Sequence, residues 1–200
     1  MIRFPGSCDE VDAVLACERV PGSSATLLWH GDSDLHGVEA IVVPGGFSYG
    51  DYLRVGAIAR FSPVMKSVIR FSAQGGLVLG ICNGFQVLCE AGLLAGALLP
   101  NIERRFICRQ VSLEVQRATM PFTADCGPGE LLSIPVKHTT GRYYAPAQIL
   151  ESLEAHGQIL LRYVHDGNPN GSSNDIAGVT NEAGNVFGLM PHPEHAVDPL

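Results

Sequence analysis

One cysteine of this 200-residue chain stands between two glycines, directly after an apolar run. Residues 77–79 are Leu-Val-Leu, residues 80–84 are Gly-Ile-Cys-Asn-Gly, and residues 85–88 are Phe-Gln-Val-Leu. This pattern predicts a buried strand, a sharp turn and a helix. Such a turn lifts a nucleophile clear of the sheet edge, and the first N–H groups of the helix favour a thiolate. We predict that Cys82 is a nucleophile. The alternative is a small, buried core cysteine.

A cysteine nucleophile requires a base, and the base requires a group that orients it. Among the seven histidines, only His192 has an acid placed by local chain geometry, in Met-Pro-His-Pro-Glu-His at 190–195. The two prolines predict an extended backbone without a helix, and side chains two residues apart then share one side. We therefore expect Glu194 to orient His192 while His195 faces away. A metal site of His192, Glu194 and His195, or a plain exposed loop, is the alternative.

A third segment has the chemistry to hold a developing negative charge. The β-branched run 41–43 ends in Pro-Gly-Gly at 44–46, which leaves backbone N–H groups open at the end of a strand. It is not a P-loop, because no Gly-Lys-Ser/Thr closes it. We expect the N–H groups of Gly46 and Asn83 to form an oxyanion hole. In isolation the segment is more typical of an ordinary glycine turn, and it is the combination of the three segments that favours the oxyanion hole.

The elements that must position these residues alternate along the chain. Apolar runs alternate with helical patterns, which predicts an α/β layer architecture in a single domain over 1–200. Asp9 is a candidate helix cap, and Ser62-Pro63 opens another helix. The expected helices cover about 10–20, 62–75, 83–92 and 146–156; the expected strands cover about 27–29, 40–43, 77–79, 106–115, 131–137 and 159–164. Strands at 176–180 and 185–190 are expected to form a hairpin.

The composition excludes several classes of protein. The formal net charge is −7 and only 16% of residues are charged, which argues against a nucleic-acid partner. No apolar stretch approaches the roughly 18 residues of a membrane span, and the first residues lack a signal-peptide core. The six cysteines show no Cys-x-x-Cys pair and no disulfide-framework spacing. We expect a cytoplasmic enzyme without a membrane partner.

The order of the three segments resembles the class I glutamine amidotransferases. Longer strings are similar to one branch of that family, the glutaminase subunits of phosphoribosylformylglycinamidine synthases. These strings are Phe4-Pro-Gly-Ser7, Pro44-Gly-Gly-Phe-Ser-Tyr-Gly-Asp-Tyr-Leu-Arg54, Gly56-Ala-Ile-Ala-Arg-Phe61, Gly80-Ile-Cys-Asn-Gly-Phe-Gln86, Asn170-Gly-Ser172 and Gly188-Leu-Met-Pro-His-Pro-Glu-His195. The resemblance extends over essentially the whole chain.

The resemblance implies a fold and an activity. The fold would be a mostly parallel central sheet with helices on both faces, in flavodoxin-like layers. Cys82, His192 and Glu194 would hydrolyse L-glutamine to glutamate and ammonia. Gln86 resembles the family residue that binds the α-amino end of glutamine. Arg105 with Phe106 is a candidate for its carboxylate, although a solvated arginine is the alternative.

The resemblance also implies partners. A large synthetase subunit would use the ammonia and ATP, with Mg²⁺, to convert formylglycinamide ribonucleotide to formylglycinamidine ribonucleotide in purine biosynthesis. A small third subunit would bridge the two. This chain itself would hold no cofactor and no metal. The alternative from another class is a DJ-1/PfpI-like stress-response or binding domain, in which the acid lies elsewhere than two residues after the histidine.

Two differences from the family are visible. Residues 138–141 are His-Thr-Thr-Gly where the family commonly has His-Gly-Glu-Gly. We also expect the chain to lack a C-terminal helix and part of the first strand found in the family.

Overall fold

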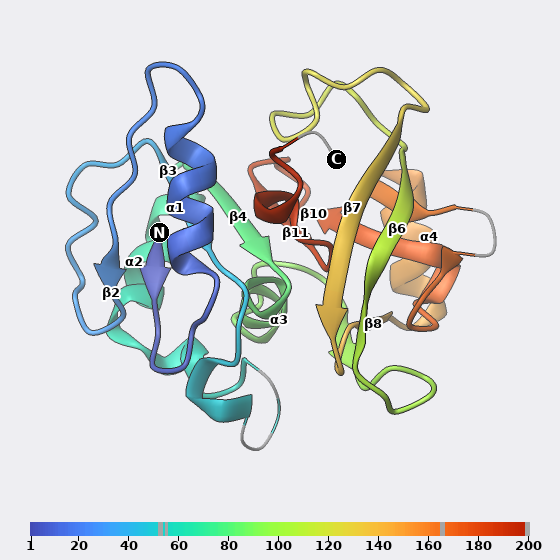
Figure 1. Cartoon of the computed structure of the whole chain (residues 1–200), viewed down its shortest axis with the longest axis horizontal. Helices are drawn as coiled ribbons and strands as arrows, with labels where there is room; N and C mark the ends of the chain where they lie inside the picture. Colours follow the sequence, from blue (N-terminus) through green and yellow to red (C-terminus); the bar gives the residue numbers. More distant parts are fainter. Residues whose placement is uncertain (52–53, 55, 165–166, 199–200) are drawn as a thin grey trace.

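The computed structural model describes residues 1–51, 54, 56–164 and 167–198 (Figure 1). Its helices are α1 (Glu10–Glu18), α2 (Pro63–Ala73), α3 (Asn83–Glu90) and α4 (Ala147–Ala155). Its strands are β1 (Ile2–Arg3), β2 (Leu28–Trp29), β3 (Ala40–Val43), β4 (Leu77–Ile81), β5 (Ala97–Leu99), β6 (Ile107–Val115), β7 (Leu131–His138), β8 (Arg142–Tyr144), β9 (Ile159–Tyr163), β10 (Ile176–Thr180) and β11 (Val186–Leu189). The expected helices and longer strands are therefore present, with ends that differ by a few residues.

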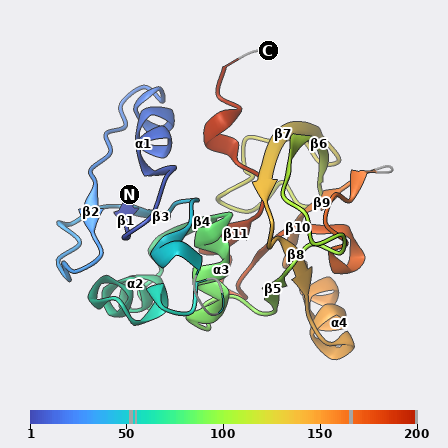
Figure 2. The ribbon, with the colours of Figure 1, turned by 60° about the horizontal axis from the view of Figure 1, so that its bottom comes forward.

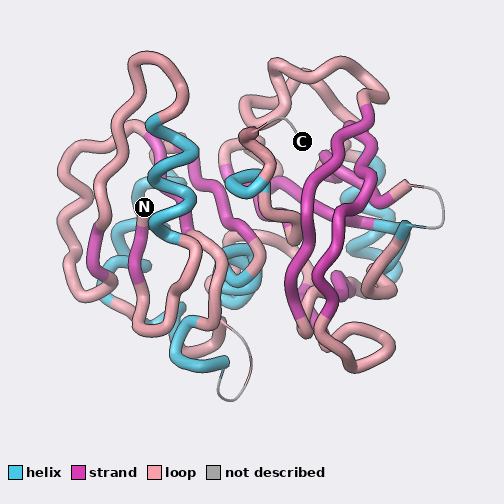
Figure 3. The backbone as a smooth tube through the Cα atoms, viewed as in Figure 1, coloured by secondary structure: helices cyan, strands magenta, loops and turns pink. Residues whose placement is uncertain are grey.

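A seven-stranded sheet forms the centre of the molecule, in the order β3-β4-β11-β10-β9-β6-β7 (Figure 3). Strands β3, β4 and β11 run parallel, whereas β10, β9, β6 and β7 pair antiparallel with their neighbours. The α/β class is confirmed, but the sheet is mixed and not mostly parallel. The reason is the connections: a parallel pair needs a crossover, usually a helix, whereas β6 runs into β7 through a loop and β10 into β11 through a tight turn.

Helices cover both faces of the parallel strands, as expected (Figure 2). Helices α2 and α3 pack on one face, where they contact β4. Helix α1 lies over the other face, where Ala13 and Ala16 border the same cavity as Leu79 and Ile81. The parallel strands are thus buried on both sides, which explains why their sequences are continuous apolar runs.

Two short sheets lie outside the central one. The expected strand near 27–29 is β2, and it pairs in parallel with β1 instead of joining the central sheet. Strands β5 and β8 form a second small antiparallel sheet that the sequence analysis did not predict. Each is three residues long, which is too short for an alternating pattern to be visible.

The expected C-terminal hairpin is confirmed, and it also belongs to the central sheet. Strand β10 pairs antiparallel with β11, and β11 pairs in parallel with β4, with Gly188 opposite Gly80. This register carries the chain after Leu189 to the edge of the sheet where β4 ends. Within the described part of the chain, no helix is long and apolar enough to cross a membrane.

Candidate active site

Cys82 lies in a strained turn between β4 and α3. Its backbone has φ 49° and ψ −101°, a positive φ that is uncommon for a residue with a side chain. A Cβ atom on Gly84 would lie 1.8 Å from the carbonyl oxygen of Val43, and one on Gly80 would lie 2.5 Å from a methyl group of Leu88. Both glycines are therefore needed for α3 to begin directly against the strands. The predicted strand, turn and helix are confirmed.

His192 and Glu194 form a buried pair beside this turn. The Nδ1 atom of His192 lies 2.6 Å from Oε1 of Glu194, and the side chains are only 1% and 2% exposed. The backbone N–H of His192 donates to the carbonyl of Pro135 at 2.8 Å, which anchors the segment to β7. Among the described residues, Nε2 of His192 has no hydrogen-bond partner. Glu194 therefore holds one ring nitrogen and leaves the other available for a reacting group.

The environment of His192 favours its protonated form. Burial disfavours the imidazolium, but the charge of Cys82, with the hydrogen bond and charge of Glu194, outweighs it and raises the pKa of His192 to about 10. A protonated imidazole next to a sulfur is the arrangement that an acid–base group of a cysteine nucleophile requires.

His195 does not face away from this pair, so that expectation is wrong. Residues Pro193–His195 form a 3-10 turn, in which the N–H of His195 donates to the carbonyl of His192 at 3.1 Å. A proline is compatible with the first position of a helical turn, because its missing N–H is not needed there. The turn brings Nε2 of His195 to 3.6 Å from Oε1 of Glu194. Spacing in an extended chain was therefore the wrong basis for placing His195.

Asp9 completes a cluster of four groups that the sequence analysis did not bring together. Ligand atoms of Asp9, His192, Glu194 and His195 all lie within 4.8 Å of one another. The metal interpretation is thus geometrically stronger than the sequence indicated. However, Nζ of Lys137 lies 2.5 Å from Oδ1 of Asp9, so a cation of the protein already pairs with one of these carboxylates. These contacts favour an ion-pair network over a metal site. That the chain binds no metal here stays a prediction.

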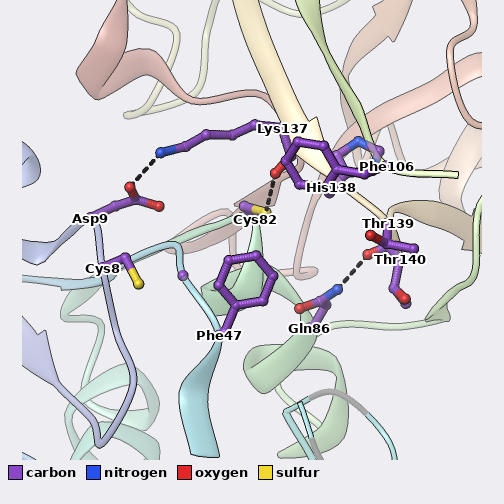
Figure 4. A pocket seen from close by; sticks show the side chains of 11 residues that line it. Cys8, Asp9, Phe47, Cys82, Gln86, Phe106, Lys137, His138, Thr139 and Thr140 are labelled. Atoms are coloured by element: carbon purple, nitrogen blue, oxygen red, sulfur yellow. Dashed lines mark hydrogen bonds and ion pairs between the residues drawn. The ribbon is translucent and has the colours of Figure 1, made fainter. Parts of the chain in front are cut away.

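A cavity of about 70 Å³ lies above the sulfur of Cys82 (Figure 4). It brings together four residues expected at the site: Gly46, Cys82, Gln86 and Phe106. It is also lined by residues that the sequence analysis did not single out for the site: Cys8, Asp9, Phe47, Lys137, His138, Thr139 and Thr140.

Most of the cavity wall opposite α3 comes from the end of β7 and the residues after it. The thiol of Cys82 lies 3.9 Å from the carbonyl oxygen of Lys137, and Nε2 of Gln86 donates to the carbonyl of Thr140 at 2.5 Å. Arg105 does not line this cavity; it is exposed, and its carbonyl accepts a hydrogen bond from Asn101 at 2.9 Å. Of the two candidates for the glutamine carboxylate, only Phe106 is in contact with the cavity.

Within the part of the chain that the structure describes, the backbone N–H groups of Gly46 and Asn83, the two proposed oxyanion donors, donate to no other backbone group. The amide side chain of Asn83 has a separate role, because it accepts from the N–H of Ser48 at 3.2 Å and donates to Gln86 at 2.9 Å. It therefore ties the loop after Gly46 to the start of α3. The geometry is compatible with an oxyanion hole, whose role stays a prediction.

His138 forms a buried, neutral part of the cavity wall. Its Nδ1 lies 3.1 Å from Oδ1 of Asn101, and its Nε2 lies 3.4 Å from the amide nitrogen of Asn170. Burial and the charge of His192 lower the pKa of His138 to about 3. A neutral imidazole donates through Nδ1 and accepts through Nε2, which matches both partners. No local pattern in the sequence signalled this role, since Asn101 and Asn170 are distant in the chain.

Comparisons with known proteins agree over the whole chain. A model of the CobB/CobQ-like glutamine amidotransferase domain matches residues 1–200. The chain is 57% identical to phosphoribosylformylglycinamidine synthase subunit PurQ of Rubrobacter xylanophilus and 55% identical to that of Frankia casuarinae, covering 100% of this chain and 90% and 85% of those proteins. It is also similar to a chain in the structure of PurLQS from Thermotoga maritima, with a TM-score of 0.89 and 45% identity over 98% of this chain and 87% of that chain.

Proposed function

This chain belongs to the family of CobB/CobQ-like glutamine amidotransferase domains, and we propose that Cys82, His192 and Glu194 are its catalytic triad. It hydrolyses L-glutamine to glutamate and ammonia as the glutaminase subunit of a phosphoribosylformylglycinamidine synthase. The ammonia serves the ATP-dependent conversion of formylglycinamide ribonucleotide to formylglycinamidine ribonucleotide in purine biosynthesis. A large synthetase subunit and a small bridging subunit are its partners. Relatives of 57% and 45% identity support this assignment.

The observation that carries the mechanism is the position of Cys82 at the N-terminus of α3, beside a protonated His192. The helix N-terminus stabilises negative charge on the sulfur. The thiolate attacks the side-chain amide carbon of glutamine, and the carbonyl oxygen becomes an oxyanion. The N–H groups of Gly46 and Asn83 are the donors available to hold that charge.

His192 then moves the protons of both half-reactions. Its imidazolium protonates the leaving nitrogen, so the carbon–nitrogen bond breaks and ammonia departs, leaving a thioester on Cys82. The neutral imidazole next takes a proton from water, which attacks the thioester and releases glutamate. Glu194 keeps the ring in one orientation through the 2.6 Å hydrogen bond to Nδ1, so that Nε2 faces the reaction.

The lining of the cavity supports substrate contacts by Gln86 and Phe106. Gln86 is fixed by hydrogen bonds to Asn83 and to the carbonyl of Thr140, and Phe106 is half exposed at the wall. Both lie in the same cavity as Cys82, where a bound glutamine must extend from its reacting amide. A role for Arg105 is not supported by its position outside the cavity lining.

We propose further that residues 1–200 form one domain and that this chain holds no cofactor of its own. The family model matches all 200 residues. Neither of the two lysines follows a glycine, so the chain has no Walker A sequence for ATP, which together with Mg²⁺ is assigned to the synthetase subunit. All six cysteines are free thiols, which supports a reducing cytoplasm.

The DJ-1/PfpI-like alternative is not favoured. In that group the acid that assists the cysteine lies elsewhere in the chain. Here the acid two residues after the histidine contacts its Nδ1 atom directly. The high identity to amidotransferase subunits points in the same direction.

Affinity labelling tests the assignment of the nucleophile. A chloroketone analogue of glutamine is expected to alkylate Cys82 alone, as read by mass spectrometry of peptides, and Cys82→Ala is expected to abolish glutamine hydrolysis. Cys8→Ala is the matched control, because Cys8 is exposed and lines the same cavity. Labelling at Cys8, or glutaminase activity in Cys82→Ala, would contradict the proposal.

A further inference from the structure

Asp9 immediately precedes helix α1, yet its side chain does not cap that helix. The carboxylate makes no hydrogen bond to the first N–H groups of α1, although Asp is among the best N-cap residues. Only 3% of Asp9 is exposed, so the charge is directed into the protein. A carboxylate that is buried and does not cap the adjacent helix indicates that Asp9 has a function in the site.

The carboxylate of Asp9 is directed at the imidazole of the triad. Its Oδ2 atom lies 3.8 Å from Nδ1 of His192, the same ring nitrogen that Glu194 contacts at 2.6 Å. Its Oδ1 atom lies 3.5 Å from Nε2 of His195. His192 therefore has two buried carboxylates on its Nδ1 side, one of which comes from a distant part of the chain.

Gly45 is the residue that permits this approach. A Cβ atom at position 45 would lie 2.5 Å from Oδ2 of Asp9 and 2.7 Å from Cε1 of His192. Any side chain there would push the carboxylate and the imidazole apart. Position 45 thus requires a glycine for the contact between Asp9 and His192, and this requirement is separate from the proposed oxyanion hole at Gly46.

Lys137 supplies the counter-charge. Its Nζ atom lies 2.5 Å from Oδ1 of Asp9, and its backbone carbonyl lies 3.9 Å from the sulfur of Cys82 (Figure 4). A carboxylate buried without such a partner would be strongly unfavourable. The same residue of β7 therefore contacts both the nucleophile and the carboxylate next to the base.

We propose that Asp9 is a positioning residue of the glutaminase reaction, which together with its counter-ion Lys137 holds the imidazole of His192 and balances the charge around it. The inference rests on the proposed function of the triad. The other titratable groups that face His192 are Cys82 from the turn before α3, Glu194 and His195 from the 3-10 turn, and His138 from β7.

The test is the pH profile of glutamine hydrolysis by the chain in its complex with the synthetase subunits, ATP and the nucleotide substrate. Asp9→Asn, Lys137→Met and the double variant are compared with Glu18→Gln, an exposed carboxylate at the far end of α1. Asp9→Asn is expected to lower kcat about tenfold with KM within about twofold, because the reacting groups are displaced, whereas Gln86 and Phe106 remain and asparagine keeps nearly the same size in the cavity lining.

The direction of the pH shift separates positioning from a purely structural role. Removing the negative charge of Asp9 destabilises the imidazolium, so the high-pH limb of kcat is expected to move down by about one pH unit. Removing the positive charge of Lys137 is expected to move the same limb up, and the double variant is expected to return toward the parent. Glu18→Gln is expected to match the parent.

Two results would overturn the proposal. The first is that the high-pH limb of kcat has the same position in the parent and in both single variants. The second is that this limb moves in the same direction in Asp9→Asn and in Lys137→Met. If Asp9→Asn does not fold, the upward shift in Lys137→Met still decides the question. An inactive parent complex would instead contradict the proposed function, so the two failures are distinguishable.

Discussion

The parallel and antiparallel halves of the central sheet contribute different things to the site. Strands β3, β4 and β11 lead into the residues for which reacting or charge-stabilising roles are proposed: Gly46, Cys82 and His192. The antiparallel pair β6 and β7 adjoins one wall of the cavity, formed by Phe106 before β6 and residues 137–140 around the end of β7. Carboxyl ends of parallel strands meet helix N-termini, and antiparallel strands present a continuous wall. The comparison therefore predicts that changes in the first half mainly affect kcat and changes in the second mainly affect KM.

Contacts close to the triad join the two halves. The backbone N–H of His192 donates to the carbonyl of Pro135 on β7, and Lys137 pairs with Asp9. The separation of catalysis from binding is therefore expected to fail at β7 residues that contact the triad, and to hold elsewhere along the wall.

The largest effect is expected at the base. His192→Ala is expected to lower the kcat of glutamine hydrolysis at least ~10²-fold with a small change in KM, because an acid–base group is lost while the cavity remains. Glu194→Gln is expected to fall between that variant and His195→Ala, because His195 contacts the carboxylates of Glu194 and Asp9 and does not line the cavity at Cys82. Steady-state kinetics of the complex measure all three. Equal losses at His192 and His195 that added zinc restores would instead favour the metal interpretation.

The close packing of the parallel half predicts the next largest effect. Gly84→Ala would place a methyl group 1.8 Å from the carbonyl oxygen of Val43, so α3 and Cys82 must move. Alanine normally stabilises a helix relative to glycine, but here we expect a loss of about 2 kcal/mol in unfolding free energy and at least ~10-fold in kcat. Gly167→Ala, with no atom within 4 Å of the added methyl group, is the control. Denaturant unfolding that shows Gly84→Ala to be more stable would refute this packing argument.

The histidines of the two halves are expected to affect stability in opposite directions with pH. The pKa of His192 is raised to about 10, so its contribution is complete below about pH 6.5 and is lost as the pH rises toward 10. The pKa of His138 is lowered to about 3, so its contribution is complete above about pH 6.5 and is lost as the pH falls toward 3.

Comparing the parent with His138→Gln isolates the contribution of His138 to the pH dependence of the unfolding free energy. Between about pH 6.5 and pH 5, the parent is expected to lose about 2 kcal/mol more unfolding free energy than the variant, since one proton binds only to the unfolded chain. Denaturant titrations at several pH values measure this difference. Parallel pH dependences of the two proteins would show that His138 is not held neutral.

The smallest effect is expected at the rim of the wall. Phe106→Ala is expected to raise the KM for glutamine about threefold and to leave kcat within about twofold, because the aromatic ring touches the cavity but no reacting group. Leu131→Ala is the matched control, since Leu131 is exposed on β7 and does not line the cavity. A fall in kcat with unchanged KM in Phe106→Ala would contradict the prediction that the antiparallel half of the sheet mainly affects KM.

Local pattern alone was sufficient for the parts of the molecule whose partners are near in the chain. The turn at Cys82 was predictable because strand, glycines and helix are contiguous, and the contact of His192 with Glu194 because only Pro193 separates them. The pairing directions were not predictable, since a buried strand has the same apolar composition in a parallel or an antiparallel pair. The 3-10 turn at Pro193 was missed because proline is compatible with both extended and early helical backbone.

The sequence by itself thus determined the strand, turn and helix around Cys82, the pairing of His192 with Glu194 and the α/β class. Only the tertiary structure decided what surrounds them. Asp9 and Lys137 are 128 positions apart, and no periodicity relates them. They meet because β7 ends beside the turn at Cys82 and because Gly45 leaves room for the Asp9 carboxylate next to His192. Contacts of this kind depend on how the elements pack. The sequence pattern carries no information about the distance in space between residues so far apart in the chain.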